Sequence, residues 1–184
     1  PKTGAAHSQR LMPLQSIAVV GASLAGKTAA AELRRGGFTG RLVVIGDEAH
    51  APYDRPPLSK ELLRGERTAQ QIALRDEAEL ANVEWQLGCR ATGLDAATCT
   101  LRFDVGQSET FDGVVIATGS RPRRLPGAEL RGVHVLRTLD DALALRADLG
   151  LSPAHVAVIG AGVIGQEVAA TCRQLGLAVS MIEL

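Results

Sequence analysis

Few cysteines, no excess charge and no long apolar run mark this 184-residue sequence, and each absence excludes a class of protein. The three cysteines, Cys89, Cys99 and Cys172, are odd in number, widely spaced and form no C-x-x-C pair. They indicate neither a disulfide framework nor a zinc site, and they fit the reducing cytoplasm, where we expect the protein to act. The histidines are scattered as well, so we predict no metal site.

The charges cancel, because 20 basic side chains stand against 20 acidic ones. No overall field attracts a nucleic-acid backbone or an anionic membrane, and we expect neither as a partner. The longest apolar stretches, around residues 17–26 and 156–165, are interrupted by glycine and are much shorter than the roughly 20 residues that span a bilayer. Residues 1–16 lack the apolar core of a signal peptide, and we expect them to be a flexible leader.

One pattern occurs twice: a short apolar run, a glycine-rich turn, an amphipathic helix and a second apolar run that ends in an acidic residue. The first copy runs from Ile17 to Asp47 and the second from Val156 to Glu183. Their apolar runs are β-branched and too short to be helices, and glycines at 36–37 and 176 stop the helices. Strands that alternate with helices predict an α/β fold with a parallel, doubly wound sheet.

Prolines organise the material between the two copies. Those at positions 52, 56 and 57 predict an extended approach to a helix that starts near Ser59. Alternating segments over 83–103 and 109–119 predict further strands, and prolines 122 and 126 mark a connector. We therefore predict a first domain over 17–121 and a second over 122–184.

The second glycine-rich turn matches the dinucleotide fingerprint in full. Gly160, Gly162 and Gly165 form G-x-G-x-x-G between a strand and a helix, where backbone N–H groups and a helix N-terminus suit a pyrophosphate. Glu183 follows at roughly the 20-residue distance of a ribose 2′-OH acceptor. The alternative is an ordinary tight turn, but the surrounding strand and helix favour dinucleotide binding.

The first turn departs from the fingerprint, since Ser23 replaces the middle glycine. Serine is small, and its hydroxyl is able to donate to a phosphate oxygen. Asp47 still ends the next strand at the expected distance. Two dinucleotide folds in one chain suggest two cofactors, and the natural pair is FAD with NAD(P)H.

Five segments, VVGASLAG, VVIGDEAHAPYDRPPLSK, VVIATGSRPRRLPG, LRTLDDA and VIGAGVIGQEVAA, carry a family resemblance. The sequence resembles the glutathione-reductase-like flavoprotein reductases that serve oxygenase ferredoxins, such as putidaredoxin reductase and the biphenyl dioxygenase ferredoxin reductase. The resemblance implies an FAD-binding Rossmann-like domain followed by the start of an NAD(P)-binding Rossmann domain. It also implies hydride transfer from nicotinamide C4 to flavin N5, and then single-electron transfer to a [2Fe-2S] ferredoxin.

The resemblance implies site residues at the two turns, at the strand ends and in the connecting segments. For FAD these are Gly21, Ser23, Leu24, Ala25, Gly26, Asp47, Glu48, Arg55, Pro56, Lys60, Ala91, Ala117, Thr118, Gly119 and Arg137. For the nicotinamide dinucleotide they are Gly160, Gly162, Val163, Ile164, Gly165, Glu167 and Glu183.

Lys60 and Glu167 are the implied catalytic residues. A cation at Lys60 stabilises negative charge on the reduced flavin, and the family places the carboxylate of Glu167 near the nicotinamide amide. The alternatives are a solvated Arg55–Lys60 pair and a first-turn acid favoured by the helix dipole. Glu183, where an NADPH enzyme has arginine, favours NADH because a carboxylate repels a 2′-phosphate.

The cysteine content of the segment YDRPPLSK distinguishes rival functions. A disulfide reductase has a redox cysteine pair there and an NADH oxidase has a single catalytic cysteine, and both are missing. An NADH oxidase nevertheless stays an alternative, together with an apoptosis-inducing-factor-like flavoprotein and a non-catalytic dinucleotide sensor. A homodimer also stays open. The second domain halts at its second strand, so we expect the chain to be an incomplete portion whose second FAD-binding segment and C-terminal domain follow Leu184.

Overall fold

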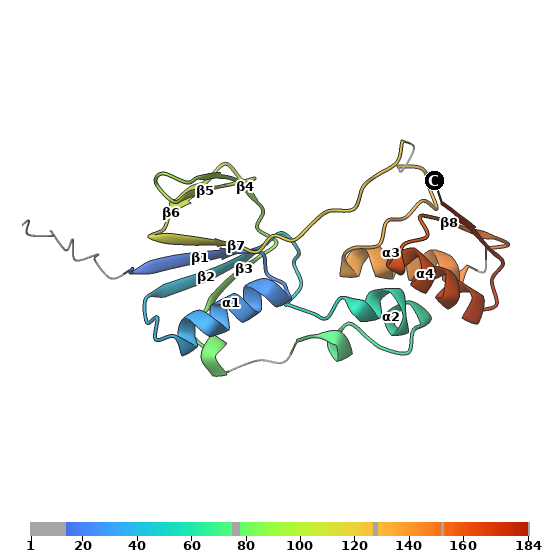
Figure 1. The fold of residues 1–184 in the computed structure, drawn as a ribbon, viewed down its shortest axis with the longest axis horizontal. Coiled ribbons are helices and arrows are strands. Elements are labelled where there is room, and N and C mark those ends of the chain that lie inside the picture. Colours follow the sequence, from blue (N-terminus) through green and yellow to red (C-terminus); the bar gives the residue numbers. More distant parts are fainter. Residues whose placement is uncertain (1–13, 75–77, 127–128, 152, 184) are drawn as a thin grey trace, which may run out of the picture.

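The computed structural model describes residues 14–74, 78–126, 129–151 and 153–183. Figure 1 shows a larger body built on a parallel sheet, a smaller body that contains α3, α4 and β8, and an extended connector between them. Most of the expected leader, residues 1–13, lies outside the described residues, and the first strand begins at Ser16. In the described part of the chain, no helix has the length and hydropathy that crossing a bilayer requires.

The larger body contains four parallel strands in the order β3-β2-β1-β7. They are β1 (Ser16–Val20), β2 (Arg41–Gly46), β3 (Glu84–Leu87) and β7 (Gly113–Ile116). The two central strands are apolar along almost their whole length because both of their faces are covered, as is usual for parallel sheets. The α/β prediction with a parallel sheet is confirmed.

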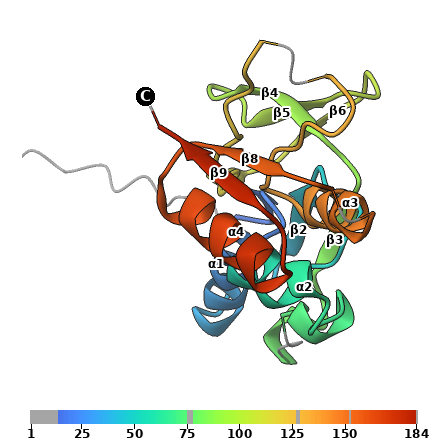
Figure 2. The same ribbon diagram turned by 90° about the vertical axis from the view of Figure 1, so that its right-hand side faces the viewer.

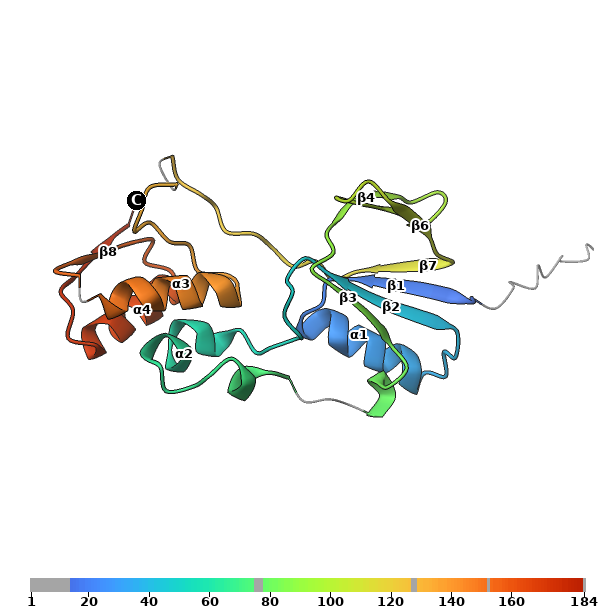
Figure 3. The same ribbon diagram turned by 180° about the vertical axis from the view of Figure 1, so that it is seen from behind.

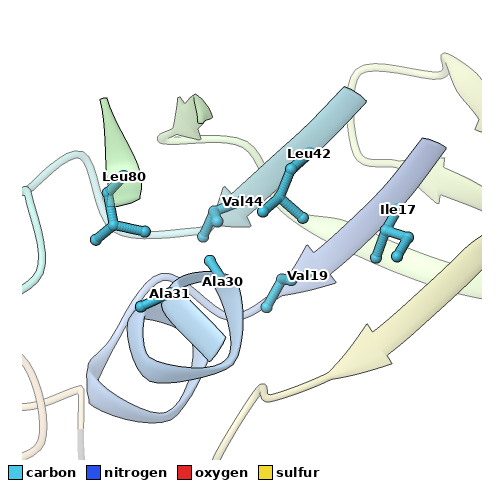
Figure 4. Packing of buried hydrophobic residues seen from close by; sticks show 7 residues of the cluster. All are labelled: Ile17, Val19, Ala30, Ala31, Leu42, Val44 and Leu80. Atoms are coloured by element: carbon cyan, nitrogen blue, oxygen red, sulfur yellow. The ribbon is translucent and has the colours of Figure 1, made fainter. Parts of the chain in front are cut away.

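Helix α1 (Leu24–Arg35) covers one face of this sheet. Its small Ala30 and Ala31 are fully buried against the β-branched Val19 and Val44, which allows the helix to approach the sheet closely (Figure 4). The helix ends as expected at the glycine pair, where Gly37 takes a φ of 90°.

A three-stranded antiparallel sheet covers the opposite face. It consists of β4 (Ala91–Asp95), β5 (Thr100–Phe103) and β6 (Ser108–Thr110). Its Leu101 and Phe103 pack with Phe111 against Val20 and Ile45. Both segments expected to form strands between the two copies do so: β4, β5 and β6 form this second layer, whereas β3 and β7 belong to the parallel sheet.

The smaller body repeats the strand–helix–strand unit. It contains α3 (Leu139–Gly150), β8 (Val156–Ile159), α4 (Val163–Gln174) and β9 (Val179–Ile182), with β8 and β9 parallel. A capping box starts α3: the Thr138 hydroxyl accepts from the Asp141 N–H, and the Asp141 carboxylate accepts from the Thr138 N–H. Asp141 thus has a structural role at the helix start.

The first part of the segment between β2 and β3 packs on the smaller body, as Figures 2 and 3 show for α2, whereas Leu80 near its end packs on the larger body. The segment forms a 3-10 helix at Pro56–Ser59, α2 (Glu61–Arg64) and two further 3-10 turns at Gln70–Ile72 and Ala78–Leu80. Buried Leu62 contacts the α3 residue Leu139 in one cluster, and Leu63 contacts the α4 residue Cys172 in another.

The helix expected to start near Ser59 is present, but a 3-10 turn precedes it where we expected extended chain. Pro56 opens the 3-10 turn that ends at Ser59, and α2 follows from Glu61. We expected the prolines to hold the chain extended, but the fixed φ of proline and its missing N–H also suit the first turn of a helix. The helix start was therefore predicted to within two residues, whereas the extended approach was wrong over Pro56–Ser59.

Candidate functional site

A cavity of about 840 Å³ opens at the carboxyl ends of β1, β2 and β7. This is the edge of the sheet where the strand order reverses around β1, and in open α/β sheets ligands bind at such a point. Eight of the residues expected to bind FAD line the cavity: Gly21, Asp47, Glu48, Arg55, Ala91, Thr118, Gly119 and Arg137.

The first glycine turn closes tightly against the sheet. The N–H of Gly21 donates to the carbonyl of Ile45 (2.7 Å), and its φ of 120° is a conformation that favours glycine. A Cβ at Gly21 would overlap the Ala117 carbonyl, and one at Gly26 would overlap the carbonyl of Gly21. Ser23 is the N-cap of α1 and makes no side-chain capping bond.

The second turn has the same backbone arrangement. The N–H of Gly160 donates to the carbonyl of Ile182 (2.8 Å), its φ is 101°, and a Cβ at Gly165 would overlap the carbonyl of Gly160. Gly162 is the N-cap of α4, as Ser23 is of α1. The repeat seen in the sequence is thus also a repeat of close backbone contacts.

An acidic residue follows the second strand of each copy. Asp47 follows β2 and lines the cavity, and Glu183 follows β9. The Glu183 carboxylate accepts a hydrogen bond from the N–H of Ala161, inside the second glycine turn. Each acid therefore lies at the carboxyl end of its sheet, next to or near the turn of its own copy.

Arg55 joins the cavity wall to the connector. Its guanidinium donates to the Glu48 carboxylate (2.7 Å) and to the carbonyl oxygen of Arg137 (2.6 Å). The Tyr53 hydroxyl donates to Glu48 and accepts from the N–H of Leu139 (2.8 Å). Burial and the bond to Glu48 raise the pKa of Tyr53, so the phenol stays protonated. Arg55 is accordingly not one of a solvated pair with Lys60.

Lys60 and Glu167 contact each other although they are 107 positions apart. The Lys60 Nζ lies 2.9 Å from Oε1 of Glu167, and the Ser59 hydroxyl donates to Oε2. These two bonds, that from Ser59 first, hold the pKa of Glu167 below its ordinary value. The two charged side chains are 34% and 31% exposed, so a ligand is able to reach the pair.

The other predicted residues lie outside the cavity lining. Those from the first body are Ser23, Leu24, Ala25, Gly26, Pro56, Lys60 and Ala117. Val163 and Ile164 lie in the first turn of α4, where they are 75% and 53% exposed.

Three residues that hydrogen-bond to or around the predicted site residues were not selected from the sequence. Tyr53 bonds to Glu48, Ser59 bonds to Glu167, and the Thr171 hydroxyl donates to the Ser59 carbonyl oxygen. Tyr53 and Ser59 stand inside YDRPPLSK, so the motif itself was the available signal. Thr171 lies one helical turn after Glu167, on the same face of α4, which is a weaker signal. Cys89 and Arg90 also line the cavity, and burial raises the pKa of the Cys89 thiol.

Comparison with known proteins gives consistent matches over almost the whole chain. The sequence model of the pyridine nucleotide-disulphide oxidoreductase family matches residues 15–184. The ferredoxin–NAD(+) reductase component of the p-cumate 2,3-dioxygenase system from Pseudomonas putida is 45% identical over 173 residues, which are 92% of this chain and 43% of that relative. The corresponding component of the biphenyl dioxygenase system from Paraburkholderia xenovorans (strain LB400) is 42% identical over 174 residues, 92% of this chain and 42% of that protein.

A solved structure, that of the covalent putidaredoxin reductase–putidaredoxin complex, matches with a TM-score of 0.81 and 35% identity. The match covers 91% of this chain and 42% of the solved chain. The chain thus spans less than half the length of each of these three relatives.

Proposed function

Because the chain belongs to the pyridine nucleotide-disulphide oxidoreductase family, we propose that it forms the FAD-binding unit and part of the NADH-binding unit of a ferredoxin reductase. Its relatives are named as reductase components of dioxygenase systems, which supports an oxygenase ferredoxin as the electron acceptor. The observation that carries the proposal is the repeated glycine turn: in each copy the last glycine lies against the carbonyl of the first, the first glycine donates to the second strand, and an acid follows that strand.

The cavity suits FAD. Its volume of about 840 Å³ lies in the range of roughly 300–1,000 Å³ that is usual for cofactor sites. We assign Asp47 to the adenosine ribose, Gly21 and the start of α1 to the pyrophosphate, and the Ala91 backbone to the adenine. Thr118, Gly119 and Arg137 complete the lining on the connector side.

The second turn suits NADH. Gly160, Gly162 and Gly165 leave room for the pyrophosphate at the N-terminus of α4, and Glu183 accepts from the ribose hydroxyls. The bond between Glu183 and the Ala161 N–H places this carboxylate beside the turn, where it repels the 2′-phosphate of NADPH. The chain therefore favours NADH.

The Lys60–Glu167 pair joins the segment after β2 to helix α4, which follows the second glycine turn. When bound, FAD and NADH supply the hydride and single-electron chemistry, and the protein orients their rings. We assign Lys60 to the flavin side, where its charge opposes the negative charge of the reduced ring. Glu167 accepts from the nicotinamide carboxamide, and the ion pair stays neutral as a whole.

We further propose an electron acceptor, a domain boundary and a cellular compartment. The acceptor is a [2Fe-2S] ferredoxin, the domains divide near residue 121, and the reaction takes place in the cytoplasm, as the three free cysteines suggest. A thiol-dependent reaction is disfavoured, because YDRPPLSK contains no cysteine.

The two ribose assignments are tested separately in the complete protein. Asp47→Ala should lower FAD retention, whereas Glu183→Ala should raise the Michaelis constant for NADH roughly 10-fold or more and relax discrimination against NADPH, since each removes a charged hydrogen-bond acceptor. Asp95→Ala, at the exposed end of β4, is the matched control and should change neither property. Unchanged cofactor preference in Glu183→Ala would contradict the assignment.

A further inference from the structure

Ser59 and Lys60 bind different carboxylate oxygens of Glu167. The Ser59 hydroxyl donates to Oε2, and the Lys60 ammonium donates to Oε1 over 2.9 Å. The Thr171 hydroxyl in turn donates to the Ser59 carbonyl oxygen over 2.7 Å. One dipeptide thus clamps the carboxylate at both oxygens, and α4 anchors that dipeptide from one helical turn further along.

Burial makes the loss of these hydrogen bonds costly. Ser59 is 5% exposed and Thr171 is 1% exposed, and a buried hydroxyl without a partner is costly. Glu167 and Thr171 are four residues apart and lie on the same face of α4. Pro56 opens the 3-10 turn that presents Ser59 to this face, and its fixed φ restricts the turn.

We propose that Ser59 is a positioning residue for hydride transfer, an inference that rests on the ferredoxin reductase function proposed above. Because the Ser59 hydroxyl occupies Oε2, the Glu167 carboxylate does not rotate into an orientation in which both of its oxygens bind the Lys60 ammonium. Lys60 then meets Glu167 through one of its three N–H groups, and the other two remain outside this pair. Ser59 therefore acts through Glu167 and Lys60 on the rings that these residues orient.

The charge state of Glu167 agrees with this role. The bond from Ser59, and after it the bond and charge of Lys60, keep the pKa of Glu167 below its ordinary value. The carboxylate is then ionised and purely an acceptor, which is the form that binds a carboxamide N–H. Thr171 contributes to this arrangement indirectly, because its hydrogen bond fixes the backbone of Ser59.

The kinetic test uses Ser59→Ala in the complete FAD-loaded protein, with anaerobic stopped-flow reduction by NADH. We expect the limiting rate constant of flavin reduction to fall roughly tenfold, while FAD content and the NADH concentration for half-saturation change less than about twofold. Thr68→Ala is the matched control, because Thr68 is an exposed hydroxyl residue of the same segment. The flavin of this control variant should be reduced by NADH at the wild-type rate.

A double-mutant cycle separates positioning from general damage. In a Glu167→Ala background, Ser59→Ala should cause less than about a twofold further loss, because the carboxylate on which it acts is gone. An undiminished loss in that background would overturn the proposal. So would a wild-type reduction rate in Ser59→Ala alone.

A second readout does not depend on turnover. In protein with ¹³C-labelled glutamate carboxyls, the pKa of Glu167 should be higher in Ser59→Ala than in the wild type, and an unchanged value would refute the contact. If wild-type flavin is not reduced by NADH, the proposed function fails, whereas this titration still tests Ser59. If Ser59→Ala does not fold, Thr171→Val replaces it, with an expected fall of about threefold in the reduction rate; an unchanged rate would contradict the anchor.

Discussion

Removal of one hydroxyl at Tyr53 should loosen the start of α3. The Tyr53 hydroxyl accepts from the N–H of Leu139, the first residue of that helix, and donates to Glu48. Tyr53→Phe keeps the ring, which is buried with Leu139, and removes these two hydrogen bonds together with the bond that the Arg55 guanidinium donates to the hydroxyl (3.2 Å). The variant therefore isolates the polar link between the segment after β2 and the smaller body.

The free-energy cost of Tyr53→Phe depends on which polar groups lose their hydrogen-bond partner. Glu48 keeps its bond to Arg55 (2.7 Å), so its carboxylate stays paired. The Leu139 N–H loses its acceptor at a site where the residue is 3% exposed, and an unsatisfied buried donor costs about 1–3 kcal/mol. We expect a loss of about 2 kcal/mol, which corresponds to a roughly 30-fold change in a local opening equilibrium.

Amide hydrogen exchange measures this opening directly. In Tyr53→Phe, exchange at Leu139 should accelerate roughly 30-fold, while the amides of α1 keep their wild-type protection. Thr138→Ala is the comparison variant, since it removes the side-chain cap of the same helix at a typical cost of about 1 kcal/mol. Unchanged protection at Leu139 in Tyr53→Phe would refute the link.

Two further predictions concern stability. The N–H groups of Gln15 and Ser16 hold the pKa of Asp112 below its ordinary value of 3.8, so these bonds are fully present above that pH and are lost as the pH falls through the folded-state pKa. Asp112→Ala should therefore be less stable than the wild type near pH 7, and urea unfolding at a series of pH values should show the difference disappear in strong acid. Leu62→Ala, at a fully buried position, should cost about 2–5 kcal/mol in the same assay, whereas Leu130→Ala, 68% exposed, should stay within about 0.5 kcal/mol; equal losses would contradict the assigned core.

The sequence was sufficient to predict the features that depend on local chemistry. The glycine turns were predictable because only glycine tolerates the φ of Gly21 and Gly160 and the close carbonyls at Gly26 and Gly165. Strand and helix periodicity led to the α/β prediction in the same way. Which residues bind FAD and NADH stays a prediction, and so does the domain boundary near residue 121.

The contacts between distant segments could not be derived from periodicity. Tyr53 meets Leu139 across 86 positions, and Ser59 meets Glu167 across 108. Neither pairing leaves a repeat in the sequence, because each depends on how the segment after β2 packs on the smaller body. The bond from Arg55 to the carbonyl of Arg137 was still less predictable, since every residue has a backbone carbonyl.

In the proposed function the two glycine turns hold FAD and NADH so that reducing equivalents pass from one cofactor to the other. Anaerobic mixing of the complete, FAD-loaded protein with NADH tests it most directly, with flavin absorbance as the signal. We expect one tightly held FAD per chain and its stoichiometric bleaching, with recovery of the absorbance when oxidised [2Fe-2S] ferredoxin is added. Bound flavin that NADH leaves oxidised would contradict the account and would favour a dinucleotide-binding protein without turnover.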